Sequence, residues 1–79
     1  MTLNETKDVA EFLFKNAVTT HIDTRDKGFY NGLIIELHET FLVINDRMMG
    51  LIPIAFSEIV KLERYREAKR GWQISHLMK

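Results

Sequence analysis

The stretch of sequence that decides the fold is residues 29–46, which read FYNGLIIELHETFLVIND. Two apolar runs, at 29–37 and 40–45, have the β-branched and large side chains typical of strands. The two residues between them, at 38–39, leave room only for a tight turn. Gly32 lies inside the first run, where a glycine marks a bend, a bulge or a close approach of two backbones. The stretch therefore predicts a bent antiparallel hairpin.

The segment before this hairpin predicts one helix and one further strand. Val9, Phe12 and Leu13 follow the i, i+3, i+4 spacing of an apolar helical stripe. A helix is therefore expected at about residues 4–15. The alternating, β-branched run at 18–23 predicts a strand.

Local signals set the limits of these two elements. Thr2 followed by Glu5 fits a capping box at the start of the helix. Residues 24–28, which read TRDKG, predict a hairpin turn after the strand. Gly28 can adopt the positive φ that such a turn often needs.

Two shorter strands follow the central hairpin, at 51–56 and 59–63, after a turn at 46–50. Pro53 has no N–H to donate, so its strand fits a sheet edge or a bulge. One helix followed by five closely spaced strands predicts a mostly β protein. We expect an N-terminal α-helix and a strongly bent, five-stranded small barrel of the SH3-like or Sm-like kind, with a C-terminal tail.

We expect the core to come from one face of each strand. A chain of 79 residues buries only about 60% of its unfolded surface, so self-association is a common way to gain stability. The predicted core residues are Val18, Ile22, Leu33, Ile35, Val43, Leu51, Ile54, Ile59 and Leu62.

Composition excludes several classes of protein. The chain has no cysteine, which excludes disulfides, thiolate chemistry and cysteine zinc sites. Residues 1–8 are polar, unlike a signal peptide, and no apolar run approaches the roughly 20 residues that span a bilayer. We therefore expect a cytoplasmic protein that does not enter a membrane and has no cofactor.

The net charge of zero hides an uneven distribution along the chain. Residues 1–60 hold five basic and nine acidic residues, whereas residues 61–79 hold six basic and two acidic residues. The basic C-terminal part suits a polyanion such as RNA, or an acidic protein neighbour.

Residues 4–63 resemble the Sm-like family, which includes the bacterial RNA chaperone with an Sm fold. The family has an N-terminal helix and five bent strands, with a glycine at the bend of the second strand, as Gly32 is here. The matching stretches are 30–37, 41–46 and, for the second motif, 54–59. The resemblance implies a single Sm-like domain over 1–79: a helix at about 4–15, a barrel at about 17–63 and a basic extension at 64–79. It also implies a homo-oligomer in which strands four and five pair between subunits.

The sequence departs from the family where the family holds RNA. His38 and Thr40-Phe41 stand where the family's pocket has an aspartate and an asparagine, and Ala55-Phe56 replaces an arginine-glycine pair. The turn at 45–50 also resembles one in PRC-barrel proteins, another small β-barrel family.

The candidate RNA-binding residues are mostly C-terminal. Basic residues interleaved with aromatic ones suit single-stranded nucleic acid, because charges follow the phosphates and rings stack on bases. Glu63 and Glu67 interrupt this run and can pair with its cations. Asp46 is expected to cap its turn, and Arg47 beside it could reach a phosphate. The predicted RNA-binding residues are His38, Arg47, Arg64, Tyr65, Arg66, Lys69, Arg70 and Trp72.

No catalytic or metal-binding motif stands out. His21, His38 and His76 are far apart in the sequence and lack metal-ligand spacing, and Ser57 has no histidine beside it. The sequence thus favours a non-catalytic, homo-oligomeric protein that binds single-stranded RNA. The alternative is a protein-interaction module that keeps the barrel without the RNA pocket.

Overall fold

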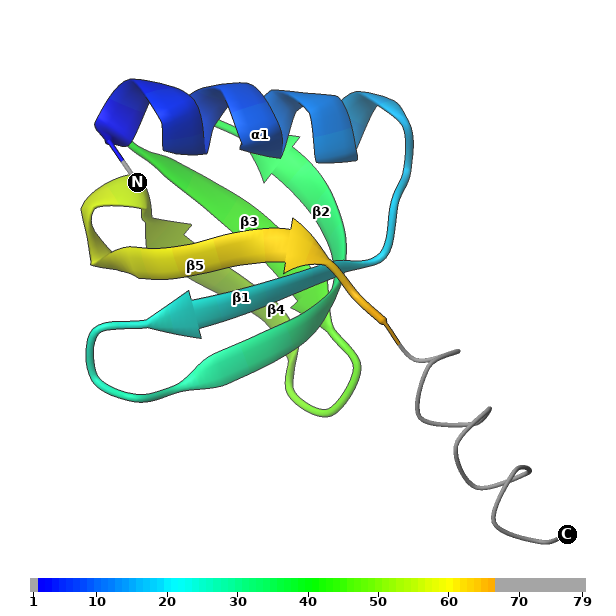
Figure 1. The fold of residues 1–79 in the computed structure, drawn as a ribbon. Coiled ribbons are helices and arrows are strands. Elements are labelled where there is room, and N and C mark those ends of the chain that lie inside the picture. The colour runs from blue at the N-terminus through cyan, green and yellow to red at the C-terminus, as the bar shows by residue number, and fades with distance from the viewer. Residues whose placement is uncertain (1, 67–79) are drawn as a thin grey trace, which may run out of the picture.

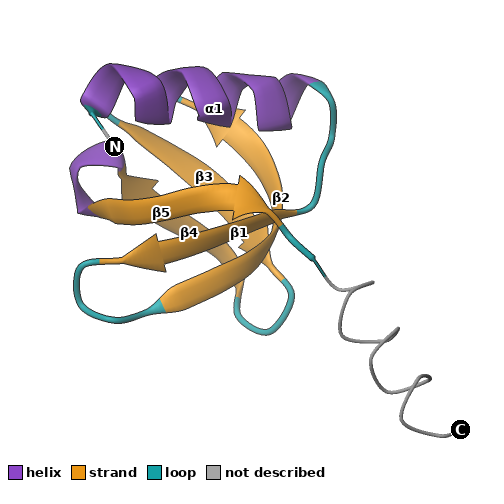
Figure 2. Ribbon diagram, in the orientation of Figure 1, coloured by secondary structure: helices purple, strands orange, loops and turns teal. Residues whose placement is uncertain are grey.

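The computed structural model describes residues 2–66, and Figures 1 and 2 show one helix lying across a strongly bent sheet. The elements follow in the predicted order: α1 (Leu3–Lys15), β1 (Thr20–Thr24), β2 (Phe29–Leu37), β3 (Phe41–Asp46), β4 (Gly50–Ala55), the 3-10 turn η1 (Phe56–Glu58) and β5 (Ile59–Arg64). The predicted fold class is confirmed. Within residues 2–66, no helix is long and apolar enough to cross a membrane.

Both ends of α1 are closed by local hydrogen bonds. The Thr2 hydroxyl accepts from the Glu5 N–H at 3.2 Å and the Glu5 carboxylate accepts from the Thr2 N–H at 2.8 Å, so the predicted capping box is confirmed. At the other end, the N–H groups of Ala17 and Val18 donate back to Phe14 and Leu13. The helix therefore ends by a compact turn that leads directly into β1.

The sheet is antiparallel with the order β4-β3-β2-β1-β5, so β4 and β5 are its two free edges. Pro53 lies on the β4 edge, as its missing N–H predicts. Because the Phe56 N–H donates to the Thr40 carbonyl, the alternation of the ladder turns the Pro53 nitrogen away from β3. The proline thus costs the β3–β4 pairing nothing and removes one donor from the free edge.

Gly32 is the point at which β2 bends closely over β3. A Cβ at this position would lie deep inside the Asn45 backbone, with the carbonyl carbon at 2.8 Å and the carbonyl oxygen closer still. The ladder also skips Ile35, a bulge between the pairs Ile34–Ile44 and Glu36–Val43. The predicted bend is present, and the close approach explains why only glycine fits.

The turn between β1 and β2 contains one difference from the prediction. Lys27, and not Gly28, takes the positive φ, at 68°. Gly28 is instead surrounded closely by the side chains of Thr24, Asp26 and Tyr30, so its small size is what the turn uses.

The core confirms half of the predicted set and corrects the rest. Ile22, Ile54, Ile59 and Leu62 are buried, and Val18 packs against them half-buried. The buried faces of β2 and β3 were predicted wrongly. Leu33 and Ile35 are exposed, Val43 is half-buried outside the core, and Leu51 on β4 is exposed. Phe12 of the predicted helical stripe is also exposed. The core residues are Ala10, Leu13, Ile22, Ile34, Leu42, Ile44, Ile54, Phe56, Ile59 and Leu62.

The physical reason for this error is the composition of the two strands. Apolar residues fill both faces of β2 and β3, so alternation cannot tell the inner face from the outer one. The outer face of the sheet is consequently apolar, with Leu33, Ile35 and Leu51 open to solvent. A surface of this kind on a small domain is typical of a contact with another chain.

Candidate nucleic-acid interface

The turn between β3 and β4 is built around the buried carboxylate of Asp46. One oxygen accepts the Asn31 N–H at 2.8 Å, and the other accepts the N–H groups of Met48 and Met49, both at 2.9 Å. The Arg47 N–H donates to the Asn31 carbonyl at 2.8 Å. These bonds fix the turn to β2, as predicted for Asp46.

The same bonds set the ionisation of Asp46. Burial acts to raise the pKa of this carboxyl, which is only 7% exposed. The three backbone N–H groups outweigh burial and hold the pKa below its ordinary value. Asp46 is therefore a carboxylate at neutral pH and serves the turn, leaving the cations around it to face solvent.

Arg47 leaves this turn toward Tyr65, the first residue after β5. Its guanidinium lies over the ring at 5.1 Å from the centroid, within the range of a cation–π contact. The Tyr65 N–H donates to the Thr19 carbonyl at 2.9 Å, which fixes the ring beside the turn. A guanidinium and an aromatic ring are thus in contact at the surface.

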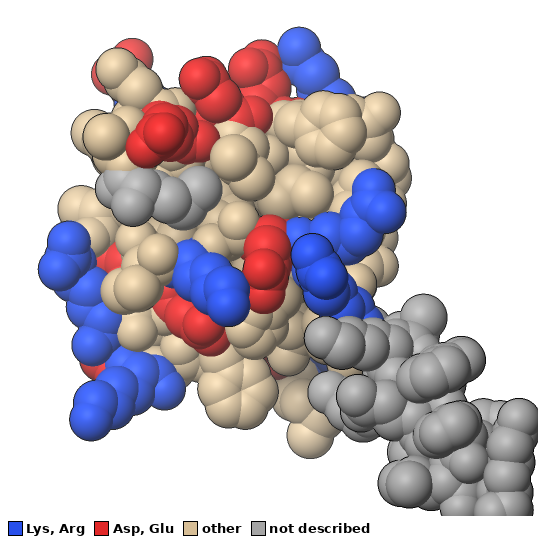
Figure 3. Space-filling model, viewed as in Figure 1, with Lys and Arg blue, Asp and Glu red and all other residues tan. Residues whose placement is uncertain are grey.

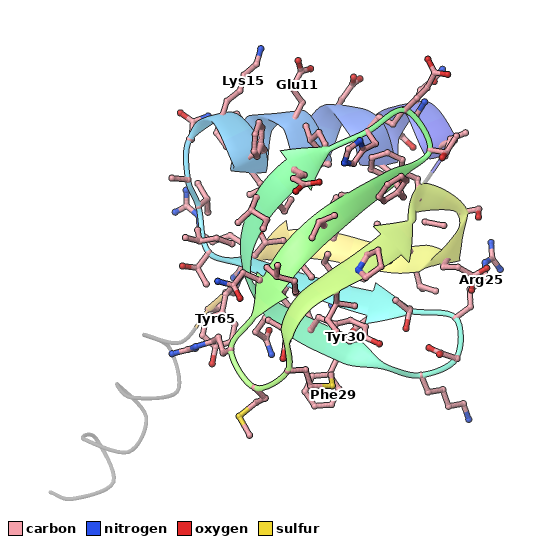
Figure 4. All side chains as sticks on the ribbon, turned by 180° about the vertical axis from the view of Figure 1, so that it is seen from behind. Glu11, Lys15, Arg25, Phe29, Tyr30 and Tyr65 are labelled. Carbon is pink, nitrogen blue, oxygen red and sulfur yellow. The ribbon has the colours of Figure 1, made fainter. Side chains whose placement is uncertain are left out.

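Three neighbouring hollows meet at Tyr65. Asn31 lines two of these hollows, and Arg47 also lines two of them. The largest is an open cleft of about 730 Å³ between Phe29 and the turn. Figure 4 shows Tyr65 and Phe29 on opposite sides of the β3–β4 turn. We call this region the Tyr65 surface and define it by Phe29, Asn31, Arg47, Arg64, Tyr65 and Arg66.

Exposed apolar side chains and basic side chains both border the Tyr65 surface. Phe29 is 64% exposed, and at the tip of the turn Met48 is 90% exposed. Arg64 and Arg66 lie along the hollow beside Tyr65. Figure 3 shows acidic side chains gathered over α1, and basic side chains near the end of β5 and on the opposite side of the same face.

Hydrogen bonds hold both the backbone and the side chain of Asn31. Its backbone is bonded to Asp46 and Arg47, as described above, and its side-chain oxygen lies 2.6 Å from Nδ1 of His21. The other ring nitrogen of His21 lies 2.9 Å from the Asp23 carboxylate. The chain Asp23–His21–Asn31 therefore presents one amide to the hollow in a defined orientation.

Four of the eight predicted RNA-binding residues come together here: Arg47, Arg64, Tyr65 and Arg66. His38 does not join them, because it lies in the β2–β3 turn at the opposite end of β3. There its ring stacks on Phe41 at 4.3 Å and bonds to Glu36 at 2.7 Å. Lys69, Arg70 and Trp72 lie outside the described residues.

Sequence reasoning missed His21, Phe29 and Asn31. They are brought together by the pairing of β1 with β2, which places His21 opposite Asn31. The signal was present as polar residues inside two β-rich runs, but the register that aligns them depends on the turn at 24–28. Within residues 2–66, no group of histidine and acidic side chains is arranged to hold a metal ion.

Comparison with solved structures shows the fold. The chain is similar to the pleiotropic translational regulator Hfq, with a TM-score of 0.64 and 15% identity over 75% of this chain and 97% of that one. It is also similar to an Hfq protein from Anabaena sp., with a TM-score of 0.63 and 20% identity over 81% of this chain and 100% of that one. No protein-family model and no curated protein matches the sequence. The Sm-like fold predicted from the sequence is therefore confirmed.

Proposed function

We propose that this protein binds single-stranded RNA on the Tyr65 surface and has no catalytic role. The observation that carries the proposal is the cation–π contact of Arg47 with Tyr65, together with Arg64 and Arg66, which line a hollow with Tyr65. Aromatic and guanidinium planes stack on bases, while arginines along a groove neutralise phosphates. The Sm-like fold supports the proposal, because the resemblance to that family implies RNA binding.

The distribution of charged residues favours RNA binding at the Tyr65 surface over other parts of the molecule. Asp8 and Glu11 are exposed on α1, and Glu36 and Glu39 are exposed at the end of β2 and in the turn after it, where they repel phosphates. The basic residues after position 60 extend the Tyr65 surface beyond Arg66 in sequence. In this proposal the tail residues Lys69, Arg70 and Trp72 add phosphate and stacking contacts.

The test is the affinity for a short single-stranded RNA at two salt concentrations. If phosphate contacts dominate, log affinity falls with log salt by about 0.7 for each neutralised phosphate. Replacing Arg64, Arg66, Lys69 and Arg70 by Gln should flatten this slope. Tyr65→Ala and Trp72→Ala should each cost about 1–3 kcal/mol if the rings stack on bases.

His38→Ala is the matched control for these variants. It removes an exposed ring from the other end of β3 and should leave both the affinity and the slope unchanged. The placement is wrong if His38→Ala abolishes binding while the Tyr65 surface variants bind normally. Absence of RNA binding at low salt would refute the proposed function as a whole.

Self-association belongs to the same proposal. The free edges β4 and β5 carry unpaired backbone groups, and the apolar outer face beside β4 needs cover. Pro53 leaves the β4 edge one donor short, a loss of about 1 kcal/mol if its partner acceptor finds water. We expect an oligomer in which β4 of one copy pairs with β5 of the next. Sedimentation that gave a monomer at micromolar concentration would exclude it.

The second candidate function is a protein-interaction module, and the exposed apolar residues favour it. Phe29, Met48 and Met49 form an apolar rim around the largest cleft. If no RNA binds, this rim and the basic tail are better explained as a docking surface for a protein with an acidic and apolar segment. Phe29→Ala would then weaken capture of that protein.

A further inference from the structure

Both ring nitrogens of His21 face oxygen atoms. Nδ1 lies 2.6 Å from Oδ1 of Asn31 and Nε2 lies 2.9 Å from Oδ1 of Asp23. A carboxylate and an amide oxygen can only accept, so this arrangement needs a proton on each ring nitrogen. In this state the Asn31 oxygen is engaged by His21, and the NH2 group is the part of the amide left for the hollow.

A neutral His21 has one N–H and one acceptor nitrogen. The Asp23 carboxylate requires the N–H at Nε2, so Nδ1 becomes an acceptor and repels the Asn31 oxygen. If the Asn31 amide turns through 180°, its NH2 group donates to Nδ1. This turn exchanges the amide oxygen and the NH2 group at almost the same positions. The hollow then meets an amide oxygen in place of an NH2 group.

We propose that Asn31 reads the base of the bound RNA and that His21 is its positioning residue, setting by its protonation which edge of the amide faces the base. This inference rests on the proposed function. With NH2 turned outward the site favours a base with a carbonyl acceptor, as uracil has at position 4. With the oxygen turned outward it favours a base with an amino donor, as cytosine has at that position.

The surroundings of Asn31 suit this role. Its backbone is anchored by Asp46 and Arg47, so the amide can turn without moving the strand. It lines two of the three hollows, and Phe29 and Tyr65 line the same two. A base held near these rings would bring its hydrogen-bonding edge to the amide.

The charged groups around His21 come from its own strand and from β5. Asp23 bonds to the ring, and Glu63 lies opposite His21 in the β1–β5 register. Glu63 is paired with Lys61 at 3.6 Å, and Arg64 and Arg66 line the same hollow. From β2, the uncharged Phe29 and Asn31 face the ring. The His21 side chain is 23% exposed, so protons reach it from solvent.

The experiment compares oligouridine with oligocytidine, two pyrimidines that differ in donors and acceptors at positions 3 and 4. Affinities are measured at roughly pH 6 and pH 8, between which histidines in general lose their charge. The uridine-to-cytidine affinity ratio should fall by about tenfold or more as the pH rises, the scale of one well-placed base contact. Overall affinity can change with pH for many reasons, but this ratio isolates the amide.

His21→Gln should make the ratio independent of pH, because glutamine cannot change its charge. His38→Gln is the matched control and should keep the full pH dependence. Nitrogen-15 NMR of the free protein gives a second readout, in which the Asn31 side-chain NH2 signals should shift together with the His21 ring nitrogens.

The outcomes separate the two claims. A ratio that stays constant with pH in the unaltered protein overturns the inference while RNA binding stands. A pH-dependent ratio that persists in folded His21→Gln also overturns it, as do Asn31 side-chain signals that stay fixed while the ring-nitrogen signals of His21 shift. If neither oligonucleotide binds at either pH, the proposed function itself fails.

Discussion

The two turns at the ends of β3 use the same strands in opposite ways. The β3–β4 turn is organised by a buried carboxylate that accepts three backbone N–H groups, and the guanidinium of Arg47 in this turn lies over the ring of Tyr65. In the β2–β3 turn, His38 is satisfied locally by Glu36 and Phe41, and all three side chains lie at or near the surface. The β3–β4 turn holds a guanidinium and an aromatic ring together beside a cleft, where a ligand can contact both. The side chains of the β2–β3 turn are bonded and stacked on one another instead.

The variant with the largest expected effect replaces Gly32, where β2 crosses closely over β3. Gly32→Val should destabilise the protein by more than about 4 kcal/mol, because the added side chain must displace the Asn45 backbone. A loss of this size is a large part of the free energy of unfolding of a small domain. Denaturant unfolding followed by circular dichroism measures the effect.

Gly50→Ala is the control for that variant within the same region. Gly50 has a φ of 81° and open space where a Cβ would lie, so strain alone should cost roughly 1–2 kcal/mol. If Gly32→Val were no worse than Gly50→Ala, the close crossing of β2 and β3 would be wrong.

The second test removes the carboxylate of the rigid turn. Asp46→Asn should cost about 2–3 kcal/mol, because an amide cannot accept from three N–H groups as a carboxylate does. Glu36→Gln, the matched change in the other turn, should cost less than about 0.5 kcal/mol, since its bond to His38 is exposed. Equal losses in denaturant unfolding would remove the distinction between the turns.

The third test uses acid. The pKa of Asp46 is lowered in the folded protein, so its contribution to stability is complete above the ordinary aspartate value near 3.9. It is lost as the pH falls below that value through the folded pKa. Asp46→Asn should therefore lose less stability than the unaltered protein between about pH 5 and pH 2. Glu5 and Asp26, whose pKa values are also lowered, titrate in both proteins and cancel in the comparison.

A small effect is also expected when the ring in the second turn is removed. His38→Ala removes a stacked but exposed ring and should change the free energy of unfolding by no more than about 1 kcal/mol. A larger loss would mean that this turn supports the fold as strongly as the one at Asp46.

Much of the fold was predictable because its signals are local. The capping box at Thr2 and Glu5, the limits of β2 and the edge position of Pro53 all follow from chemistry within a few residues. The inner faces of β2 and β3 were not predictable in this way, since both faces are apolar. Burial there is decided by the crossing at Gly32 and the bulge at Ile35, which are tertiary features.

The candidate site shows the same difference between residues that local sequence signals predict and residues that only the tertiary structure brings together. Arg64, Tyr65 and Arg66 were predicted because charges and rings near one another in sequence suggest RNA, and Arg47 because it lies in a turn beside Asp46. The pairing of His21 with Asn31 needs the β1–β2 register, and the separation of His38 needs the three-dimensional path of β3. Sequence reasoning therefore identified the charged and aromatic residues at the end of β5, and it missed Asn31, which lines the same hollow.

The most direct test of the account is an NMR titration of the isotope-labelled full chain with a short single-stranded RNA at low salt. The account predicts that backbone amide signals of residues 29–31, 47–49 and 64–66 shift together, while those of 38–41 stay in place. Shifts centred on 38–41 and 55–57, with the Tyr65 surface unaffected, would contradict it.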